Sequence, residues 1–326
     1  MATSRPLQSF LGGVGLSLPV HALLLLNGNI FGVSGFLHRA VRGSREAIAS
    51  ALGLVLGGMV AGWIEGAGPQ PSVSLPFPYL ILSGFLVGVG TKMANGCTSG
   101  HMIAGISRFS LRSITATATF FSTGVITARL LHGNSLQPVR FLDLSLDRTA
   151  KALLAFQAVP FLISALLYIF APPPPRDSAN KSQTTHPALR LVASLATAFQ
   201  FALALRVSDL TEPIRVVAFL LLPFNEAFDP SLAFLALGAL PLAIILYQLA
   251  RGPEQPRLGG PWSVPTGARV DPRLLIGSAL FGIGWGLSGF CLGPGLVNLG
   301  RAVSAGSDPL PVLGWLAAVI IGGFVV

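Results

Sequence analysis

The side chains in this chain best suited to unusual chemistry are its two cysteines, Cys97 and Cys291. A shift of 194 positions superimposes the first cysteine on the second, and the same shift places Gly88 on Gly282. A thiol can donate a weak hydrogen bond to an anion, attack an electrophile or form a disulfide. A single cysteine among apolar residues is most often a small buried hydrophobe. Two cysteines at matching positions, with no others elsewhere, favour a paired functional role.

The composition places these cysteines in a membrane protein. Charged residues make up 10% of the chain and apolar residues 52%, with a mean hydropathy of +0.71, whereas soluble domains carry about 25% charged residues. A membrane-spanning helix needs about 20 apolar residues. The segments without Lys, Arg, Asp or Glu are 7–38, 47–64, 66–91, 113–128, 152–175, 230–250, 274–300 and 309–326. We therefore expect an integral, multi-pass membrane protein with lipid around it, and the plasma membrane is the favoured location.

Several other classes of function lack support in the sequence. The net charge of +9 comes from bases scattered over short loops, which is typical of cytoplasmic loops rather than of a nucleic-acid surface. No zinc-ligand spacing, nucleotide-phosphate loop or Ser/His/Asp arrangement is visible. We therefore expect no nucleic-acid partner, no metal, no cofactor and no ATP-driven or other enzymatic activity.

A proline-rich polar segment, 172–187, divides the chain and reads as a semi-rigid linker. It separates a first membrane repeat, 7–171, from a second one, 188–326. The repeat extends beyond the cysteine segments, because Ala51-Leu52-Gly53 aligns with Ala236-Leu237-Gly238.

The charges of the loops reverse between the two repeats. The loop 39–45 carries three arginines, whereas its counterpart 223–230 carries Glu226 and Asp229 and no base. Conversely, the loop 65–77 carries only Glu65, whereas its counterpart 251–273 carries four arginines. Because basic loops stay in the cytoplasm, the repeats are predicted to insert in opposite directions. The expected fold is an all-α polytopic bundle of eight to ten spanning helices with two inverted repeats.

Four apolar runs are interrupted, and each break is followed by a short segment. The short segments are Ile30–Leu37, His101–Ile106, Ile214–Leu222 and Gly295–Val303. They are too short to span a bilayer, so we expect re-entrant half-helices that are buried or line a cavity. Each cysteine directly precedes such a segment. Helix N-termini carry unpaired N–H groups and about half a positive charge, so several of them at one depth would attract a small anion.

The polar residues beside Cys97 have two readings each. His101 is a hydrogen-bonded packing residue or a pore residue. Lys92 has two alternative roles: its side chain extends to the membrane interface, or its charge attracts anions toward Cys97. Asn95 is more often a turn or cap residue than a substrate contact.

The run Asn95-Gly96-Cys97-Thr98-Ser99-Gly100-His101, together with Ser288-Gly289-Phe290-Cys291-Leu292-Gly293-Pro294, resembles the YeeE/YedE sulfur-transport family. The resemblance covers both halves, and the chain is similar to a fusion of two half-sized permeases. It implies a permease for thiosulfate or a related anion, in which Cys97 and Cys291 line the substrate path. A soluble sulfur-handling partner also fits this resemblance. Residues around the two cysteines are further candidates for substrate contacts, namely Lys92, Asn95, Gly96, Thr98, Ser99, Gly100, His101, Ser288, Gly289 and Gly293.

The family's thiosulfate carriers have a further cysteine near the first broken helix. The matching stretch here, Asn29-Ile30-Phe31-Gly32, has none. Sulfite, persulfide, hydrosulfide-related species and a selenium compound therefore stay open beside thiosulfate. A different class also stays open, namely a membrane thiol enzyme or sensor that accepts sulfane sulfur or forms a disulfide. Such an enzyme needs a base, and His101 is the local candidate.

Overall fold

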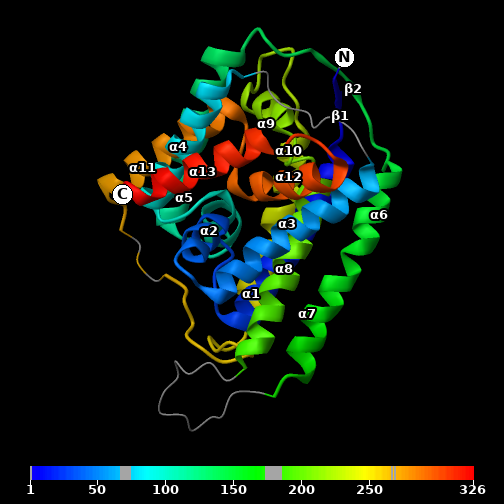
Figure 1. Ribbon diagram of the computed structural model, residues 1–326, viewed down its shortest axis with the longest axis vertical. Helices are drawn as coiled ribbons and strands as arrows, with labels where there is room; N and C mark the ends of the chain where they lie inside the picture. Colours follow the sequence, from blue (N-terminus) through cyan, green and yellow to red (C-terminus); the bar gives the residue numbers. More distant parts are fainter. Residues whose placement is uncertain (1, 67–74, 173–185, 266, 268) are drawn as a thin grey trace.

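The computed structural model describes residues 2–66, 75–172, 186–265, 267 and 269–326, and it is built almost wholly of helices (Figure 1). The first part of the chain forms α1 (Pro6–Asn27), α2 (Val33–Val41), α3 (Arg45–Glu65), α4 (Phe77–Ala94), the π-helix η1 (Ser99–Gly105), α5 (Leu111–His132), α6 (Arg148–Phe156) and α7 (Ala158–Phe170). The second part forms α8 (Pro187–Val207), α9 (Pro213–Leu220), α10 (Ser231–Ala250), α11 (Pro272–Ser288), α12 (Leu292–Ala305) and α13 (Leu310–Phe324).

Among the described residues, eight helical segments are long and apolar enough to cross a membrane. Two of these segments each combine neighbouring helices, namely Arg148–Phe170, which contains α6 and α7, and Pro272–Ala305, which contains α11 and α12. Large apolar side chains such as Leu130, Phe170 and Leu249 are exposed on the outside of the bundle. Such exposure is unfavourable in water but suits contact with lipid. The predicted all-α polytopic fold is confirmed.

Long and short helices follow the same order in both parts of the chain. The order long, short, long, long, short, long describes α1 to α5 with η1, and it recurs in α8 to α13. The four short elements are α2, η1, α9 and α12, and each follows one of the predicted breaks. The first begins at Val33 rather than Ile30, because the backbone is still extended at Gly32.

The contacts of α8 establish the direction of the first helices. At one end of the bundle, the Arg190 side chain pairs with Glu46 at the start of α3, 2.7 Å away. At the other end, Arg206 pairs with Glu65 at the end of α3, so α8 and α3 are parallel. The α1 helix runs the other way, because Asn27 at its end donates to the Arg190 carbonyl. Thus α1 and its counterpart α8 are antiparallel.

The remaining pairs of long counterpart helices are also antiparallel. The α10 helix begins beside the N-terminus of α1, where Ser231 contacts Ser4, so it opposes α3. The end of α4 packs on the start of α11 through Ala94 and Leu274. The α13 helix runs parallel to α4, because Gly84 and Gly88 lie against Trp315 and Val319 in turn. The α5 helix runs parallel to α11, because Gly282 and Gly286 lie against Phe120 and Gly124. Since α4 and α11 are antiparallel, α5 and α13 are antiparallel as well. This reversal is the inverted arrangement that the loop charges predicted. The predicted repeat boundaries stay a prediction, and most of the linker 172–187 lies outside the described residues.

The two ends of the bundle differ in charge. At the end where α1 finishes, which we call the basic end, bases outnumber carboxylates. Its bases are Arg39, Arg42, Arg45, Lys92, Arg108, Arg112, Arg190, Arg251, Arg257, Arg269 and Arg273, and its described carboxylates are Glu46, Glu254 and Asp271. At the opposite end, which we call the ion-pair end, bases and carboxylates balance. The positive-inside rule therefore predicts that the basic end faces the cytoplasm.

Glycines let the long helices approach closely. Gly84 and Gly88 of α4 lie against the backbone of α13 at Trp315 and Val319. In the same way, Gly58 of α3 lies against the carbonyl of Val297 in α12, at a distance that leaves no room for a Cβ atom. Small residues at one-turn spacing support such packing in membranes.

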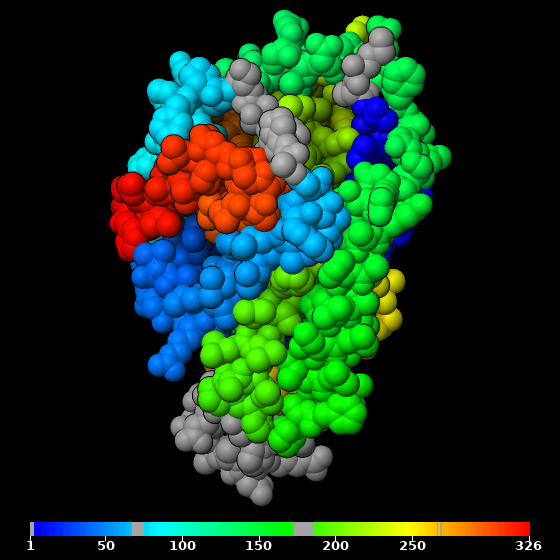
Figure 2. Space-filling view, turned by 45° about the vertical axis from the view of Figure 1, so that its right-hand side comes forward, coloured from blue at the N-terminus to red at the C-terminus, as the bar shows by residue number. Residues whose placement is uncertain are grey.

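The α6–α7 segment has no counterpart in the second half. Asp147, just before α6, pairs with Arg5 at the ion-pair end, 3.0 Å away. Ala171, just after α7, packs with Leu26 and Leu258 at the basic end. Figure 2 shows this segment along the right-hand side, beside α3. A short parallel sheet of β1 (Ala2–Ser4) and β2 (Val139–Leu142) also departs from the all-α expectation.

Candidate functional site

The two cysteines occupy equivalent positions at the starts of their half-helices. The Cys97 carbonyl accepts the first helical hydrogen bond from His101 N–H at 2.8 Å, and the Cys291 carbonyl accepts one from Gly295 N–H at 2.8 Å. Cys291 has an extended backbone directly before α12. Cys97 is separated from η1 by Thr98, which is already helical. The N-terminal N–H groups of both half-helices therefore begin beside a thiol.

Both sulfurs are buried, reduced and in contact with hydroxyl groups. The Thr98 hydroxyl lies 3.2 Å from Cys291 Sγ, and the Ser99 hydroxyl lies 3.3 Å from Cys97 Sγ. Ser34 N–H, in the first turn of α2, donates to Cys97 Sγ at 3.5 Å. Elements from three of the four breaks thus meet at the thiols.

A central cavity of about 510 Å³ contains both cysteines. Its polar wall consists of the two thiols and the hydroxyls of Thr98 and Ser99. The rest is apolar, with Phe121, Phe201, Phe219 and Trp285 among the larger side chains. Few water molecules would compete with weak donors in such surroundings, so thiol and hydroxyl contacts gain in strength.

A second cavity, of about 340 Å³, opens at the basic end, and we call it the basic vestibule. Its described lining includes no carboxylate, and its bases come from α2, α4 and the region around η1 and α5. These bases are His38, Arg39, Arg42, Lys92, His101, Arg108 and Arg112. A cleft lined by one sign of charge concentrates ions of the opposite sign, so this vestibule favours anions.

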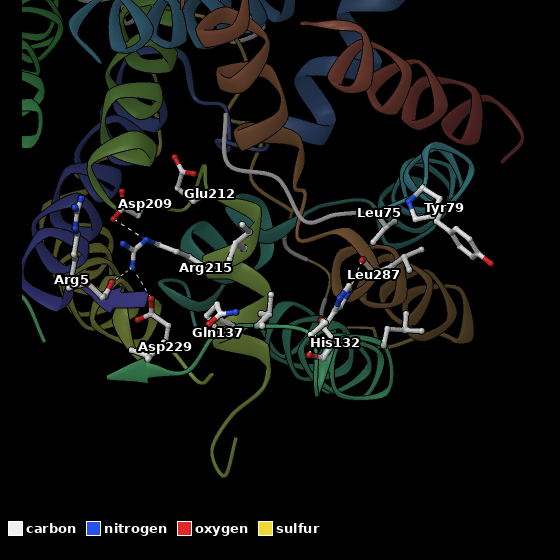
Figure 3. A pocket seen from close by; sticks show the side chains of 18 of the residues that line it. Arg5, Leu75, Tyr79, His132, Gln137, Asp209, Glu212, Arg215, Asp229 and Leu287 are labelled. Atoms are coloured by element: carbon white, nitrogen blue, oxygen red, sulfur yellow. Dashed lines mark hydrogen bonds and ion pairs between the residues drawn. The ribbon is translucent and has the colours of Figure 1, made fainter. Parts of the chain in front are cut away.

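A third cavity, of about 880 Å³, lies at the ion-pair end, and we call it the ion-pair pocket (Figure 3). Asp209, Glu212 and Arg215 from the α8–α9 region line it, together with His132 from α5 and Arg5. The His132 ring is held by a 2.9 Å contact of Nε2 with the Leu287 carbonyl.

The half-helices of the two repeats form the walls between these three spaces. On the side of the basic vestibule, Val33 lines the central cavity while the next residue, Ser34, lines the vestibule. On the other side, Leu210 lines the central cavity while Asp209 and Glu212 line the ion-pair pocket. The segments at the breaks therefore separate the central cavity from the basic vestibule on one side and from the ion-pair pocket on the other.

The residues proposed from the sequence separate into three groups. Cys97, Thr98, Ser99, Cys291 and Gly293 line the central cavity. Lys92, Asn95, Gly96, Gly100 and His101 line the basic vestibule. Ser288 and Gly289 line none of the three spaces.

Ser288 and Gly289 instead shape the end of α11. The Ser288 hydroxyl donates to Gly284 and accepts from Phe290 N–H. Gly289 has a φ of 71° and lies against Pro213 at the start of α9. The left-handed conformation and this close contact both explain a glycine there.

His101 is held by its neighbours although it lines the vestibule. Nε2 lies 3.3 Å from the Ala94 carbonyl, and Nδ1 lies 3.2 Å from the Ser113 hydroxyl. Neither ring nitrogen contacts a thiol, so the local base that a thiol enzyme would need is engaged elsewhere.

Several residues of these cavities were missed from the sequence. Ser34 was not recognised, because nothing in the sequence indicates that its N–H reaches a cysteine 63 residues away. Arg108 and Arg112 were also missed, although bases soon after the Gly100-His101 motif were a usable signal. In the described ranges, no group of three or more His, Cys, Asp or Glu residues is arranged to hold a metal ion.

Comparison with known proteins gives two family matches along the chain. Residues 4–127 match a family described as sulphur transport. Residues 189–326 match a family described as of unknown function. No solved structure is significantly similar to the chain.

Curated relatives come from Xylella fastidiosa, and each is described as a probable transporter. One from strain 9a5c is 48% identical over 123 residues, which are 37% of this chain and 91% of the relative. Another from that strain is 35% identical over 137 residues, which are 42% of this chain and 89% of the relative. Each relative is therefore matched over most of its own length by less than half of this chain, as expected for half-sized proteins. The chain belongs to the sulphur-transport family of multi-pass membrane proteins.

Proposed function

We propose that the protein conducts a small sulfur-containing anion, thiosulfate or a close relative, past Cys97 and Cys291. The path runs from the basic vestibule through the central cavity to the ion-pair pocket. The observation that carries the proposal is that one cavity contains both thiols, each at the start of a half-helix from a different half of the chain.

The chemistry of the cavity suits transient binding of an anion. Thiols and hydroxyls are neutral donors, and the half-helix N-termini add positive potential without a fixed charge. An anion bound in this way is stabilised but not trapped, as passage requires. Sulfur-containing anions have polarisable atoms that match the soft thiols better than oxygen-only anions do.

The contacts favour a permease over a thiol enzyme. Among the described residues, the recorded side-chain contacts of both sulfurs are hydroxyls, with no histidine or carboxylate among them. A nucleophilic thiol needs a base or a cationic neighbour to form its thiolate. Donation of a hydrogen bond from an intact thiol has no such requirement.

Uptake of ³⁵S-labelled thiosulfate into liposomes that contain only the purified protein tests the proposal. We expect uptake above that of protein-free liposomes, and competition by unlabelled sulfur species will rank sulfite, persulfide and sulfide against thiosulfate. Absence of uptake for every sulfur anion tested, with a monodisperse protein, would contradict the proposal. Accumulation of a persulfide on either cysteine, detected by mass spectrometry without any flux, would support the thiol enzyme instead.

A further inference from the structure

The ion-pair pocket is bordered by a connected network of seven charged side chains, which we call the ion-pair cluster. Its arginines are Arg206, Arg215 and Arg301, and its carboxylates are Glu65, Asp209, Glu212 and Asp229. They come from α3, the α8–α9 region, α12 and the start of α10, so the cluster joins both halves of the chain. Figure 3 shows Asp209, Glu212, Arg215 and Asp229 around the pocket.

The cluster has one carboxylate more than it has guanidinium groups. Arg5, which also lines the pocket, does not compensate, because its partner is Asp147 at 3.0 Å. An unbalanced charge in buried surroundings costs several kcal/mol. Since arginine does not lose its proton in proteins, the imbalance is relieved most simply when one carboxylate binds a proton.

Glu212 is the carboxylate with the weakest partners. Asp229 accepts from Arg215 at 2.8 Å and from Ser231 N–H at 2.9 Å. Glu65 accepts from Arg301 at 2.7 Å, and Asp209 accepts from Arg206 at 2.7 Å.

Glu212, by contrast, has only ion-pair distances of 3.3 Å to Arg301 and 3.5 Å to Arg206. Its side chain is 91% buried, and neither oxygen has a hydrogen-bond partner among the described residues. Burial, reinforced by the nearby Asp209 and Glu65, raises the pKa of Glu212, although Arg206 and Arg301 oppose this.

The position of Glu212 connects it with the proposed path. It directly precedes α9, in the same link that places Leu210 in the central cavity. Within that link, the Thr211 carbonyl accepts from Asn298 of α12, the half-helix that begins after Cys291. A change of charge at Glu212 therefore acts on the wall between the ion-pair pocket and the thiols.

We propose that Glu212 binds a proton from the ion-pair end and that the protein moves this proton together with the anion. With Glu212 ionised, the cluster carries an excess negative charge that repels an anion from the pocket. With Glu212 protonated, the cluster is neutral, and Arg206 and Arg301 each lose one ion-pair partner. The proton adds to one carboxylate oxygen on loading and leaves to the other compartment with the anion, so each cycle is a symport. This inference rests on the proposed anion permeation.

The test uses liposomes that contain the full-length protein, a pH-sensitive dye in the lumen and a proton-tight membrane. Thiosulfate is added outside, and its labelled uptake and the lumenal pH are measured in the same samples. We expect the wild-type protein to acidify the lumen in proportion to uptake. Above the pKa of the site, uptake should fall about tenfold per unit rise in external pH.

Two substitutions locate the proton site. Glu212→Gln removes the titrating group, so thiosulfate uptake should no longer be accompanied by acidification of the lumen beyond that of protein-free liposomes. Glu226→Gln is the matched control, because Glu226 lies at the same end and is exposed. Among the described residues, its one recorded contact is through its backbone carbonyl, which accepts from Val139 N–H. This control variant should retain the wild-type ratio of protons to thiosulfate. If Glu212→Gln does not purify as a monodisperse protein, Glu212→Asp replaces it and should retain the proton ratio with a shifted pH midpoint.

The outcomes separate this inference from the permeation proposal. Uptake without proton movement in the wild-type protein overturns symport but leaves permeation standing. Proton movement that persists in Glu212→Gln, or that keeps an unshifted midpoint in Glu212→Asp, overturns the assignment to Glu212. Uptake that responds to a sodium gradient and not to a pH gradient makes the cluster a cation site and overturns the proton proposal. No uptake of any sulfur anion overturns the permeation proposal itself.

Discussion

The Thr98 hydroxyl lies 3.2 Å from Cys291 Sγ, although 193 residues separate the two along the chain. Thr98 directly follows Cys97, so this contact joins the cysteine break of one half to the cysteine break of the other. The wall of the central cavity is therefore built jointly, and neither half of the chain supplies it alone.

The first prediction concerns the thiols. Cys97→Ala and Cys291→Ala should each reduce thiosulfate uptake by about tenfold or more, because loss of one donor in a desolvated site costs about 1–3 kcal/mol. Both variants should still fold, since alanine fits the space of a cysteine. Uptake into liposomes and size-exclusion profiles measure the two effects. Wild-type rates in both alanine variants would mean that the cysteines only pack.

A second prediction separates sulfur from simple hydrogen bonding at the same positions. Cys97→Ser and Cys291→Ser replace a large, soft donor by a smaller and stronger one. If polarisable sulfur is required, these variants should resemble the alanine variants in uptake of thiosulfate. Recovery of wild-type uptake by both serine variants would show that any neutral donor suffices.

A third prediction concerns Lys92 in the basic vestibule. A single charge about 4 Å away contributes about 1 kcal/mol in water-like surroundings, so Lys92→Ala should raise the half-saturation concentration of thiosulfate about fivefold. The effect should shrink at high salt, because exposed charges are screened. The control is Lys151→Ala, since Lys151 is exposed on α6 at the other end. Equal half-saturation concentrations in both variants would contradict a role in attracting anions and would support a role for Lys92 at the membrane interface.

The fourth prediction concerns His101, whose contacts favour a structural role. His101→Ala leaves the Ser113 hydroxyl and the Ala94 carbonyl without this partner, which should cost about 1–3 kcal/mol of stability. Thermal unfolding in detergent should show a lower midpoint, with half-saturation of the remaining uptake little changed. A normal unfolding midpoint together with weakened substrate affinity would instead make His101 a substrate contact.

The fifth prediction concerns the orientation of the halves. Single cysteines introduced at Arg42 and at Phe224, both exposed, should react with a membrane-impermeant maleimide from opposite sides. The native cysteines are buried and should give little background. The position at Arg42 should be labelled only after the membrane is opened, if the basic end is cytoplasmic. Labelling of both positions from one side would be incompatible with inverted halves.

Much of the fold could be predicted from local sequence. The uncharged runs located the spanning helices except α8, which carries Arg190 and Arg206 near its ends and matches none of those runs. The reversal of charge between 39–45 and 223–230 indicated the opposite directions of the two halves. The shared cavity of Cys97 and Cys291 follows from the same repeat, because inverted halves meet at a common centre. That anions pass through this cavity stays a prediction.

The parts that could not be predicted depend on contacts between distant segments. Ser288 and Gly289 stand near Cys291 in sequence, but neither lines the cavity. The left-handed Gly289 lies against Pro213 of α9, and the Ser288 hydroxyl bonds to Gly284 and Phe290 at the end of its own helix. Glu212 stands just before the predicted short segment Ile214–Leu222, but its place in a charged cluster could not be predicted, since its partner Arg301 lies 89 positions further along the chain.

The α6–α7 segment has a consequence for how such a chain can be assembled. Each inverted half runs between the two ends of the bundle with four long helices, α1, α3, α4 and α5 in the first half and α8, α10, α11 and α13 in the second, and so ends on the side where it began. A second half joined directly to the first would therefore enter from the wrong face. The additional crossing from Asp147 to Ala171 returns the chain from the ion-pair end to the basic end, where the second half begins. Two separately synthesised halves would not require this crossing. Removal of this one crossing should invert the second half while leaving its sequence intact.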